Sequence, residues 1–298
     1  VGLSPSGVAF DSSNGYVYVN NWGSKNVSVI NGATNTVIAN IPVGSNTYQL
    51  AEQIAGVAFD SSNGYVYVAN ELSNNVSVIN GATNTVIANI TVGLCPSGVA
   101  FDSSNGYVYV ANCGSNSVSV INGATNKVIA NITVGSGPYG AAFDSSNGYV
   151  YVANYGSNSV SVINGATNTV IANINVESNP YGAAFDSSNG YVYVANRGSN
   201  SVSVINGATN KVIANITVGF TPSGVAFDSS NGYVYVNNWG SNNVSVINGA
   251  TNTVIANITV GSGPSGAAFD SSNGYVYVTN FYSNSVSVIN GATNKVIA

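Results

Sequence analysis

The sequence predicts an all-β fold built from seven equivalent four-stranded antiparallel sheets. The first observation is a repeat: A-F-D-S-S-N-G-Y-V-Y-V and close variants recur seven times, 42 residues apart except for a first interval of 49. The second is that short β-branched and aromatic runs alternate with polar residues in every copy, and no stretch has helical spacing. Repeats of this length and content are typical of β-propeller blades, so we expect one seven-bladed propeller domain over residues 1–298.

The first copy shows how each blade is built. Its four expected strands cover residues 7–11, 16–19, 27–30 and 36–41. Ser-Ser-Asn-Gly and Asn-Gly-Ala-Thr-Asn separate the first from the second strand and the third from the fourth, and they contain the Gly and Asn that hairpin turns favour. Each blade is therefore expected to be a four-stranded meander. The blades are expected to begin near residues 3, 45, 94, 136, 178, 220 and 262.

The two ends of the chain continue one another in the repeat. Val1 and Gly2 occupy positions of the pattern that follow shortly after the position of Ala298. We therefore expect the termini to meet in or near the outermost strand of the last blade and to share that strand. Because the chain begins inside a repeat, we also expect it to be an excised piece or mature fragment, flanked by other cell-surface sequence.

Composition narrows the class of protein. Apolar residues make up 45% of the chain and charged residues only 5%, which predicts a folded protein rather than a disordered one. A net charge of −5 with five scattered cations argues against nucleic acid as a partner. No apolar run reaches the roughly 18 residues of a membrane span. A fold with few ion pairs loses little stability when its carboxylates are protonated, so we expect an acid-stable protein from an extracellular setting. We also expect the ring to be monomeric.

The repeated motifs resemble a known family. P-x-G-V-A-F-D, Y-V-Y-V-A-N, S-V-S-V-I-N and T-V-I-A-N-I-T-V-G are similar to the YVTN-type β-propeller repeat of archaeal surface-layer proteins, and residues 275–280 even contain Y-V-T-N. The similarity covers the whole chain. It implies an extracellular, cell-surface role in adhesion, interaction or envelope architecture.

Acidic residues are the first candidates for catalytic or metal-binding groups. One aspartate per repeat precedes Ser-Ser-Asn-Gly, where its oxygens are expected to accept hydrogen bonds from the turn. These residues are Asp11, Asp60, Asp102, Asp144, Asp186, Asp228 and Asp270. The chain has no His and no Met, so we expect no cofactor, no metal site and no catalytic residue. The rival prediction is a lactonase-like hydrolase that uses Glu71, Arg197 or the aspartate ring.

Two cysteines lie in one blade. Cys95 precedes the first strand of blade three, and Cys113 follows its second strand, so both lie in connections at the same end of a meander. We expect them to form a disulfide, which fits an oxidising compartment. The alternative is a pair of unrelated small residues.

Seven Asn-x-Ser/Thr sequons occupy two positions of the repeat. The sites are Asn26, Asn75 and Asn243 before the third strand, and Asn89, Asn131, Asn215 and Asn257 in the fourth. If the host glycosylates them, the second group would place sugar on the outer rim. Otherwise they are polar strand residues.

Variation among the copies is concentrated at one end of the predicted ring. The expected ligand-binding residues are Trp22, Glu71, Leu72, Tyr139, Tyr155, Tyr181, Arg197, Phe220, Trp239 and Phe281. Trp, Tyr and Arg dominate binding hot spots, so we expect this end to bind a cell-surface glycan or protein. Two alternatives remain: neutral drift in exposed loops, and a purely structural envelope element without a ligand.

Overall fold

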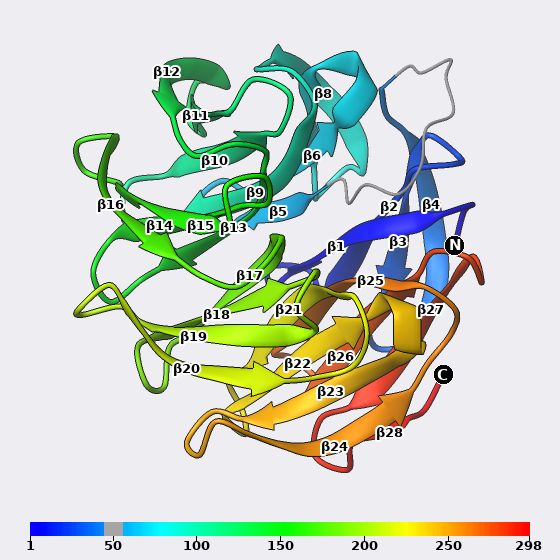
Figure 1. Ribbon diagram of the computed structural model, residues 1–298. Coiled ribbons are helices and arrows are strands. Elements are labelled where there is room, and N and C mark those ends of the chain that lie inside the picture. Colours follow the sequence, from blue (N-terminus) through cyan, green and yellow to red (C-terminus); the bar gives the residue numbers. More distant parts are fainter. Residues whose placement is uncertain (45–55) are drawn as a thin grey trace.

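The computed structural model describes residues 1–44 and 56–298; residues 45–55, within the longer first interval of the repeat, where the sequence predicts an insertion before blade two, lie outside this range. The described strands form seven four-stranded antiparallel sheets, each with its strands in chain order. The sheets are arranged around a common axis (Figure 1). The predicted seven-bladed propeller is therefore confirmed.

Each blade contributes one strand to each of four concentric layers. The innermost strands are β1 (Pro5–Asp11), β5 (Val57–Asp60), β9 (Pro96–Asp102), β13 (Pro138–Asp144), β17 (Pro180–Asp186), β21 (Pro222–Asp228) and β25 (Pro264–Asp270). The second strands are β2 (Tyr16–Asn21), β6 (Tyr65–Asn70), β10 (Tyr107–Asn112), β14 (Tyr149–Asn154), β18 (Tyr191–Asn196), β22 (Tyr233–Asn238) and β26 (Tyr275–Asn280).

The two outer layers follow the same order. The third strands are β3 (Asn26–Asn31), β7 (Asn75–Asn80), β11 (Ser117–Asn122), β15 (Ser159–Asn164), β19 (Ser201–Asn206), β23 (Asn243–Asn248) and β27 (Ser285–Asn290). The outermost strands are β4 (Thr36–Pro42), β8 (Thr85–Thr91), β12 (Lys127–Thr133), β16 (Thr169–Asn175), β20 (Lys211–Thr217), β24 (Thr253–Thr259) and β28 (Lys295–Val296).

The hydrophobic core lies between neighbouring blades rather than inside any one of them. Between blades four and five, Tyr151, Val160 and Val162 pack against Val192 and Val194 of the next sheet. Equivalent clusters fill the other junctions. A single twisted sheet cannot bury both of its apolar faces alone, so the ring is what makes each blade stable.

The repeated aspartates hold the first hairpin of each blade, as predicted. In blade four, Oδ1 of the fully buried Asp144 accepts hydrogen bonds from N and Oγ of Ser146 over 2.9 and 2.6 Å, and Oδ2 accepts from Nδ2 of Asn147 over 2.7 Å. Asn147 also donates to the carbonyl oxygen of Gly207 in blade five over 3.2 Å. The aspartates therefore organise the turns and the asparagines link the blades, although Oδ2 of Asp270 is buried without a hydrogen-bond partner.

Glycine lines the axis because the innermost strands come too close for a side chain. A Cβ atom at Gly140 would collide with the carbonyl oxygen of Tyr181 in the next blade. The same collision with the next blade would occur at Gly98, Gly182, Gly224 and Gly266. The residue before each of these glycines, by contrast, varies between copies.

The ring closes between blades seven and one. Tyr277 and Val288 pack against Val17 and Val19, as at the other junctions. The prediction that Val1 and Gly2 would complete the outermost strand of the last blade is wrong, because these residues lie outside any strand. β28 covers only two residues and pairs only with the end of β27.

The N-terminal segment nevertheless lies beside the last blade. The backbone N of Ser4 donates a hydrogen bond to Oδ1 of Asn284 over 2.8 Å. Figure 1 shows both ends of the chain on the side of the ring where the first and last blades meet. In residues 1–44 and 56–298, no helix has the length and apolar character needed to cross a membrane.

Candidate functional site

One face of the ring carries the variable residues, and we call it the variable face. It consists of the loops between second and third strands together with the linkers that enter each innermost strand. A left-handed residue ends each of these loops: Lys25, Asn74, Asn116, Asn158, Asn200, Asn242 and Asn284. Because the loop conformation repeats, the variable side chain leaves the backbone at the same place in every blade.

The loop in two blades forms a short 3₁₀ helix, η1 (Glu71–Ser73) and η2 (Trp239–Ser241). The asparagine that ends the preceding strand anchors the loop. In blade five, Nδ2 of Asn196 donates to Oγ of Ser201 and Ser203 over 3.1 and 2.9 Å. These buried bonds fix the end of the second strand, and with it the direction in which the next residue projects.

Aromatic residues of different blades meet across this face. Trp239 lies 5.2 Å from Phe281 between ring centroids, and Phe281 lies 6.3 Å from Trp22. On the other side, Tyr139 stacks on Tyr181 with centroids 4.9 Å apart. Such contacts each stabilise by about 0.5–1.5 kcal/mol beyond their burial, so they hold the side chains in a defined arrangement.

Arg197 joins the two aromatic groups. Its guanidinium carbon lies 5.2 Å from the ring centroid of Tyr181 and 5.5 Å from that of Trp239. Tyr155 extends the series through an edge contact with Tyr139 at 5.4 Å. We call this continuous set of contacts the aromatic arc, and its members are Trp22, Phe281, Trp239, Arg197, Tyr181, Tyr139 and Tyr155.

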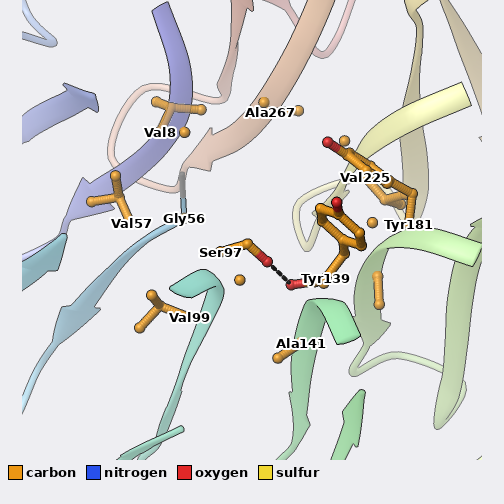
Figure 2. Close-up of a pocket in the computed structure, with 17 residues that line it drawn as sticks. Val8, Gly56, Val57, Ser97, Val99, Tyr139, Ala141, Tyr181, Val225 and Ala267 are labelled. Carbon is orange, nitrogen blue, oxygen red and sulfur yellow. Dashed lines mark hydrogen bonds between the residues drawn. The ribbon is translucent and has the colours of Figure 1, made fainter. Parts of the chain in front are cut away.

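A cavity of about 110 Å³ lies on the axis. Its wall is formed by the innermost strands and is mostly apolar, with Val8, Val57 and Val99 from the early blades. In Figure 2, Tyr139 and Tyr181 project from β13 and β17 toward the centre of this cavity. The aromatic arc and the axial cavity are therefore parts of one site.

Serine or tyrosine precedes the axial glycine in every blade except the second, where the sequence has Ala55, and this choice makes the cavity wall uneven. Oγ of the buried Ser97 donates to the carbonyl oxygen of Tyr139 over 2.9 Å, which Figure 2 shows as a dashed line. Ser223 and Ser265 make the same kind of bond to the following blade. A tyrosine at this position projects into the cavity instead, so the wall is aromatic on one side and small on the other.

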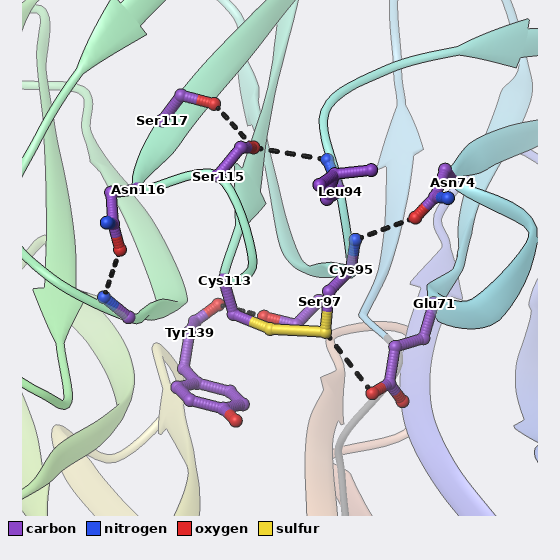
Figure 3. Close-up of a disulfide and its surroundings, with 11 residues drawn as sticks. Glu71, Asn74, Leu94, Cys95, Ser97, Cys113, Ser115, Asn116, Ser117 and Tyr139 are labelled. Carbon is purple, nitrogen blue, oxygen red and sulfur yellow. Dashed lines mark hydrogen bonds between the residues drawn. A yellow bond between two sulfur atoms is a disulfide. The ribbon is translucent and has the colours of Figure 1, made fainter.

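The predicted disulfide is confirmed. Cys95 and Cys113 are bonded, with their Cα atoms 5.3 Å apart, and the bond ties the linker entering blade three to that blade's variable loop. Figure 3 shows Glu71 of the neighbouring blade pointing at this disulfide, and its Oε1 lies 3.3 Å from Sγ of Cys95. The disulfide thus forms part of the rim of the site.

Glu71 is an acidic group in an apolar setting. Its side chain is only 9% exposed, and burial raises the pKa of its carboxyl from 4.5 to about 7. Burial also raises the pKa of Tyr139 to about 12; the charge of Glu71 raises it further, and that of Arg197 lowers it. Glu71 and Arg197 therefore both act on the hydroxyl of Tyr139, although they belong to blades two and five.

Two predicted residues of the variable face are not members of the arc. Leu72 and Phe220 are exposed, by 38% and 65%. Tyr282, which the sequence prediction omitted, lies 5.1 Å from Trp239 and 5.3 Å from Phe281 between centroids. Its position beside the variable Phe281 was the available signal, because five of the other six blades have glycine there and the sixth has leucine.

The two groups of sequons differ in exposure. Asn89, Asn131, Asn215 and Asn257 of the outermost strands are exposed, whereas Asn26, Asn75 and Asn243 are partly buried. Among the residues that the structure describes, no group of three or more His, Cys, Asp or Glu side chains is placed to hold a metal ion.

These features define a β-propeller whose variable residues gather on one face, at one end of its axis. The chain belongs to the lactonase, seven-bladed β-propeller family, which it matches over residues 2–128 and 134–254. Among solved structures it is similar to Kuenenia stuttgartiensis hydrazine synthase, with a TM-score of 0.84 and 22% sequence identity over 96% of this chain and 95% of that chain. At this identity the similarity shows the fold alone. No curated protein matches the sequence.

Proposed function

We propose that this protein is a non-catalytic, extracellular binding propeller that recognises a cell-surface glycan or protein through its variable face. The observation that carries the proposal is the aromatic arc. Trp22, Trp239 and Arg197 come from three different blades, yet one series of contacts joins them beside the axial cavity. Drift in independent loops would not require the variable residues of neighbouring blades to pack on one another.

The chemistry of the face also favours binding over catalysis. The chain has no His, and the seven aspartates hold turns at the opposite end of each second strand. The carboxylate of Glu71 lies against the disulfide at the rim of the site. Aromatic residues with a single guanidinium are groups that recognise ligands by contact area and hydrogen bonds.

The cellular setting is part of the same proposal. The disulfide between Cys95 and Cys113 supports an oxidising compartment, because such bonds are rare in the cytosol. The YVTN-like repeats support a surface-layer-type, archaeal protein, and the small number of charged residues supports an acid-stable, monomeric ring. A thermal melt at about pH 2 that stays near the melt at about pH 7 would support the acid setting.

Binding is tested with a glycan array and with intact cells. The wild-type protein is compared with the double variant Trp22→Ala, Trp239→Ala, and with Ile129→Ala as a control that removes an exposed apolar side chain from the outermost strand β12, outside the variable face. We expect the double variant to lose binding and the control to retain it. Binding that is equal in all three proteins would favour drift in the loops. Self-assembly into ordered sheets without any ligand would favour a structural envelope element.

A lactonase-like hydrolase is the second candidate. It is favoured by the family match and by Glu71, whose pKa of about 7 suits a general base. The test is a panel of sugar and alkyl lactones with the wild type and Glu71→Gln. Hydrolysis that the substitution abolishes, with the fold unchanged, would establish this function in place of binding alone.

A further inference from the structure

The wall of the axial cavity is mostly apolar because of the residues that follow each axial glycine. Four blades contribute valine at this position and three contribute alanine: Val8, Val57, Val99, Val225, Ala141, Ala183 and Ala267. The two blades that carry tyrosine before the glycine are both among those with alanine. Because alanine lacks the methyl groups of valine, the wall recedes in the blades from which the tyrosines enter the cavity.

The serine hydroxyls beside the cavity already donate hydrogen bonds within the protein. Oγ of Ser97 donates to the carbonyl oxygen of Tyr139 over 2.9 Å. Ser223 and Ser265 donate to carbonyl oxygens of the next blade over 2.9 and 3.1 Å. A hydroxyl has one hydrogen to donate, so a sugar that entered the cavity would receive no hydrogen bond from these groups in exchange for its bonds to water. An apolar group has no such bonds to lose.

One side of the cavity is aromatic and the other is aliphatic. Tyr139 stacks on Tyr181 with an angle of 25° between the rings, which restricts the orientation of Tyr139. Figure 2 shows Val8, Val57 and Val99 across the cavity from Tyr139. A flat ring between these two sides would contact aromatic carbon on one and methyl groups on the other. Aromatic rings favour offset or edge contacts with a second ring, so an aromatic ligand suits this wall.

The size of the cavity suits a single six-membered ring. An apolar cavity of about 150 Å³ takes up benzene. The axial cavity, at about 110 Å³, has a volume of the same order. An indole ring is larger, and its N–H group needs a hydrogen-bond partner when it is buried. Because the aromatic arc continues the site over several blades, the ligand is expected to extend beyond the ring that enters the cavity.

We propose that the axial cavity binds the phenyl ring of a phenylalanine side chain in a peptide or protein ligand, while the aromatic arc contacts the residues on either side of it. This inference rests on the proposed function, because it selects a protein ligand and names the group that enters the site. Burial of the phenyl ring is expected to raise affinity roughly 10- to 100-fold over alanine at the same place. Contact with Tyr139 is expected to favour phenyl over a saturated cyclohexyl ring roughly 2- to 10-fold.

Titration followed by the NMR signals of the probe tests the inference. The probes are the capped tripeptides Gly-Phe-Gly and Gly-Ala-Gly, and a third tripeptide with cyclohexylalanine in the middle. Toluene serves as the ring alone and is expected to compete with Gly-Phe-Gly for the cavity. The wild-type protein is expected to bind Gly-Phe-Gly most tightly of the three peptides, with the two ratios given above.

Two variants use residues that other blades already carry. The triple variant Ala141→Val, Ala183→Val, Ala267→Val narrows the cavity by placing valine after the axial glycine in every blade. It is expected to weaken binding of Gly-Phe-Gly by roughly 10-fold or more. Tyr139→Ser removes an aromatic side of the wall, and serine occupies this position in four of the other blades. It is expected to abolish the preference for phenyl over cyclohexyl.

The matched control is the triple variant Ala124→Val, Ala166→Val, Ala208→Val. It adds the same methyl groups to exposed alanines in the hairpins between third and fourth strands, at the opposite end of the ring, and should bind like the wild type. Melting temperatures establish that each variant is folded.

Three results would overturn the inference. One is a folded cavity variant, with the three valines, that binds Gly-Phe-Gly as tightly as the wild type. The others are a wild-type protein that does not bind Gly-Phe-Gly, whether or not it binds toluene, and one that prefers the cyclohexyl analogue. If the cavity variant keeps full binding to glycans or cells and only Trp22→Ala, Trp239→Ala abolishes it, the inference fails and the proposed function stands.

Discussion

Tyr277 in the last blade donates its hydroxyl hydrogen bond to Oδ1 of Asn35 in the first blade over 2.8 Å. Tyr151 and Asn210 make the same bond at an interior junction, over 2.7 Å. The seam at which the ring closes therefore has the side-chain link of the other junctions. What the seam lacks is a full outermost strand, because β28 covers only two residues whereas β24 covers seven.

The last blade is expected to open locally before the rest of the ring. The first half of β27 has no pairing with β28, which pairs only at Ile289 and Asn290. Backbone amides there exchange through low-energy local openings. Hydrogen exchange followed by mass spectrometry should show faster exchange in β27 and β28 than in β23 and β24. Equal protection in the two blades would contradict this prediction.

Loss of the closing hydrogen bond is expected to cost as much as loss of an interior one. Tyr277→Phe and Tyr151→Phe each remove a bond to the next blade, and the free energy of unfolding should fall by about 0.5–1.5 kcal/mol in both. Urea denaturation measures the two variants against the wild type. If Tyr277→Phe alone were without effect, the seam would not be closed in solution.

The ring is expected to lose stability at high pH. Burial raises the pKa of Tyr18, Tyr151, Tyr193 and Tyr277 from 10.0 to about 12. Folding therefore favours the neutral phenol. This contribution to stability is complete below about pH 10, the ordinary value, and is lost as the pH rises toward 12.

The loss of stability at high pH is measured by urea denaturation at several pH values, together with the absorbance of tyrosinate. The free energy of unfolding should fall above about pH 10, and the absorbance change of the buried tyrosines should accompany unfolding. Ionisation of every tyrosine in a ring that stays folded would contradict the assignment of these phenols to the blade junctions.

The disulfide is expected to stabilise the propeller by about 3 kcal/mol, since it closes a loop with a sequence separation of 18 residues. The double variant Cys95→Ser, Cys113→Ser should show this loss in urea denaturation, and reduction of the wild type should reproduce it. The control is the double variant itself, which a reductant should leave unchanged. Two free thiols in the unfolded, unreduced protein would refute the bond.

Periodicity predicted the fold because the repeat and the strand pattern are both local properties of the sequence. The 42-residue spacing gave the number of blades, and alternation gave the four strands. The failed prediction concerned Val1 and Gly2. The prediction assumed that residues which continue the repeat in sequence also pair in space. Strand pairing requires that residues lie opposite one another, and the first half of β27 has no such residues in β28.

The site was predictable as a set of positions but not as a set of contacts. Comparing the copies identified the variable loop position, and a repeated loop geometry placed Trp22, Arg197 and Trp239 at one end of the ring. Contacts between blades depend on side-chain rotamers and on the radius of the ring, which no single repeat encodes. The position of Arg197 between Tyr181 and Trp239, and that of Glu71 against Cys95, therefore emerged only from the structure.

Glu71 is expected to make stability depend on pH near neutrality. Its pKa rises from 4.5 to about 7 because burial disfavours the carboxylate, so folding favours the protonated form. The contribution of this group is fully present below about pH 4.5 and is lost as the pH rises through about 7. Glu71→Gln is neutral at every pH and should therefore be more stable than the wild type at about pH 8 but not at about pH 4.5.

Urea denaturation of both proteins across this pH range is the measurement. Glu177→Gln is the matched control, because it removes an acidic group from a linker of the same face, where Glu177 accepts a hydrogen bond from Ser201. Glu177→Gln should not raise the free energy of unfolding at about pH 8, because the carboxylate of Glu177 accepts a hydrogen bond. The carboxylate of Glu71, by contrast, is buried among apolar groups. A difference between Glu71→Gln and the wild type that stays constant with pH would mean that Glu71 is solvated, and the general-base role in lactone hydrolysis would lose its physical basis.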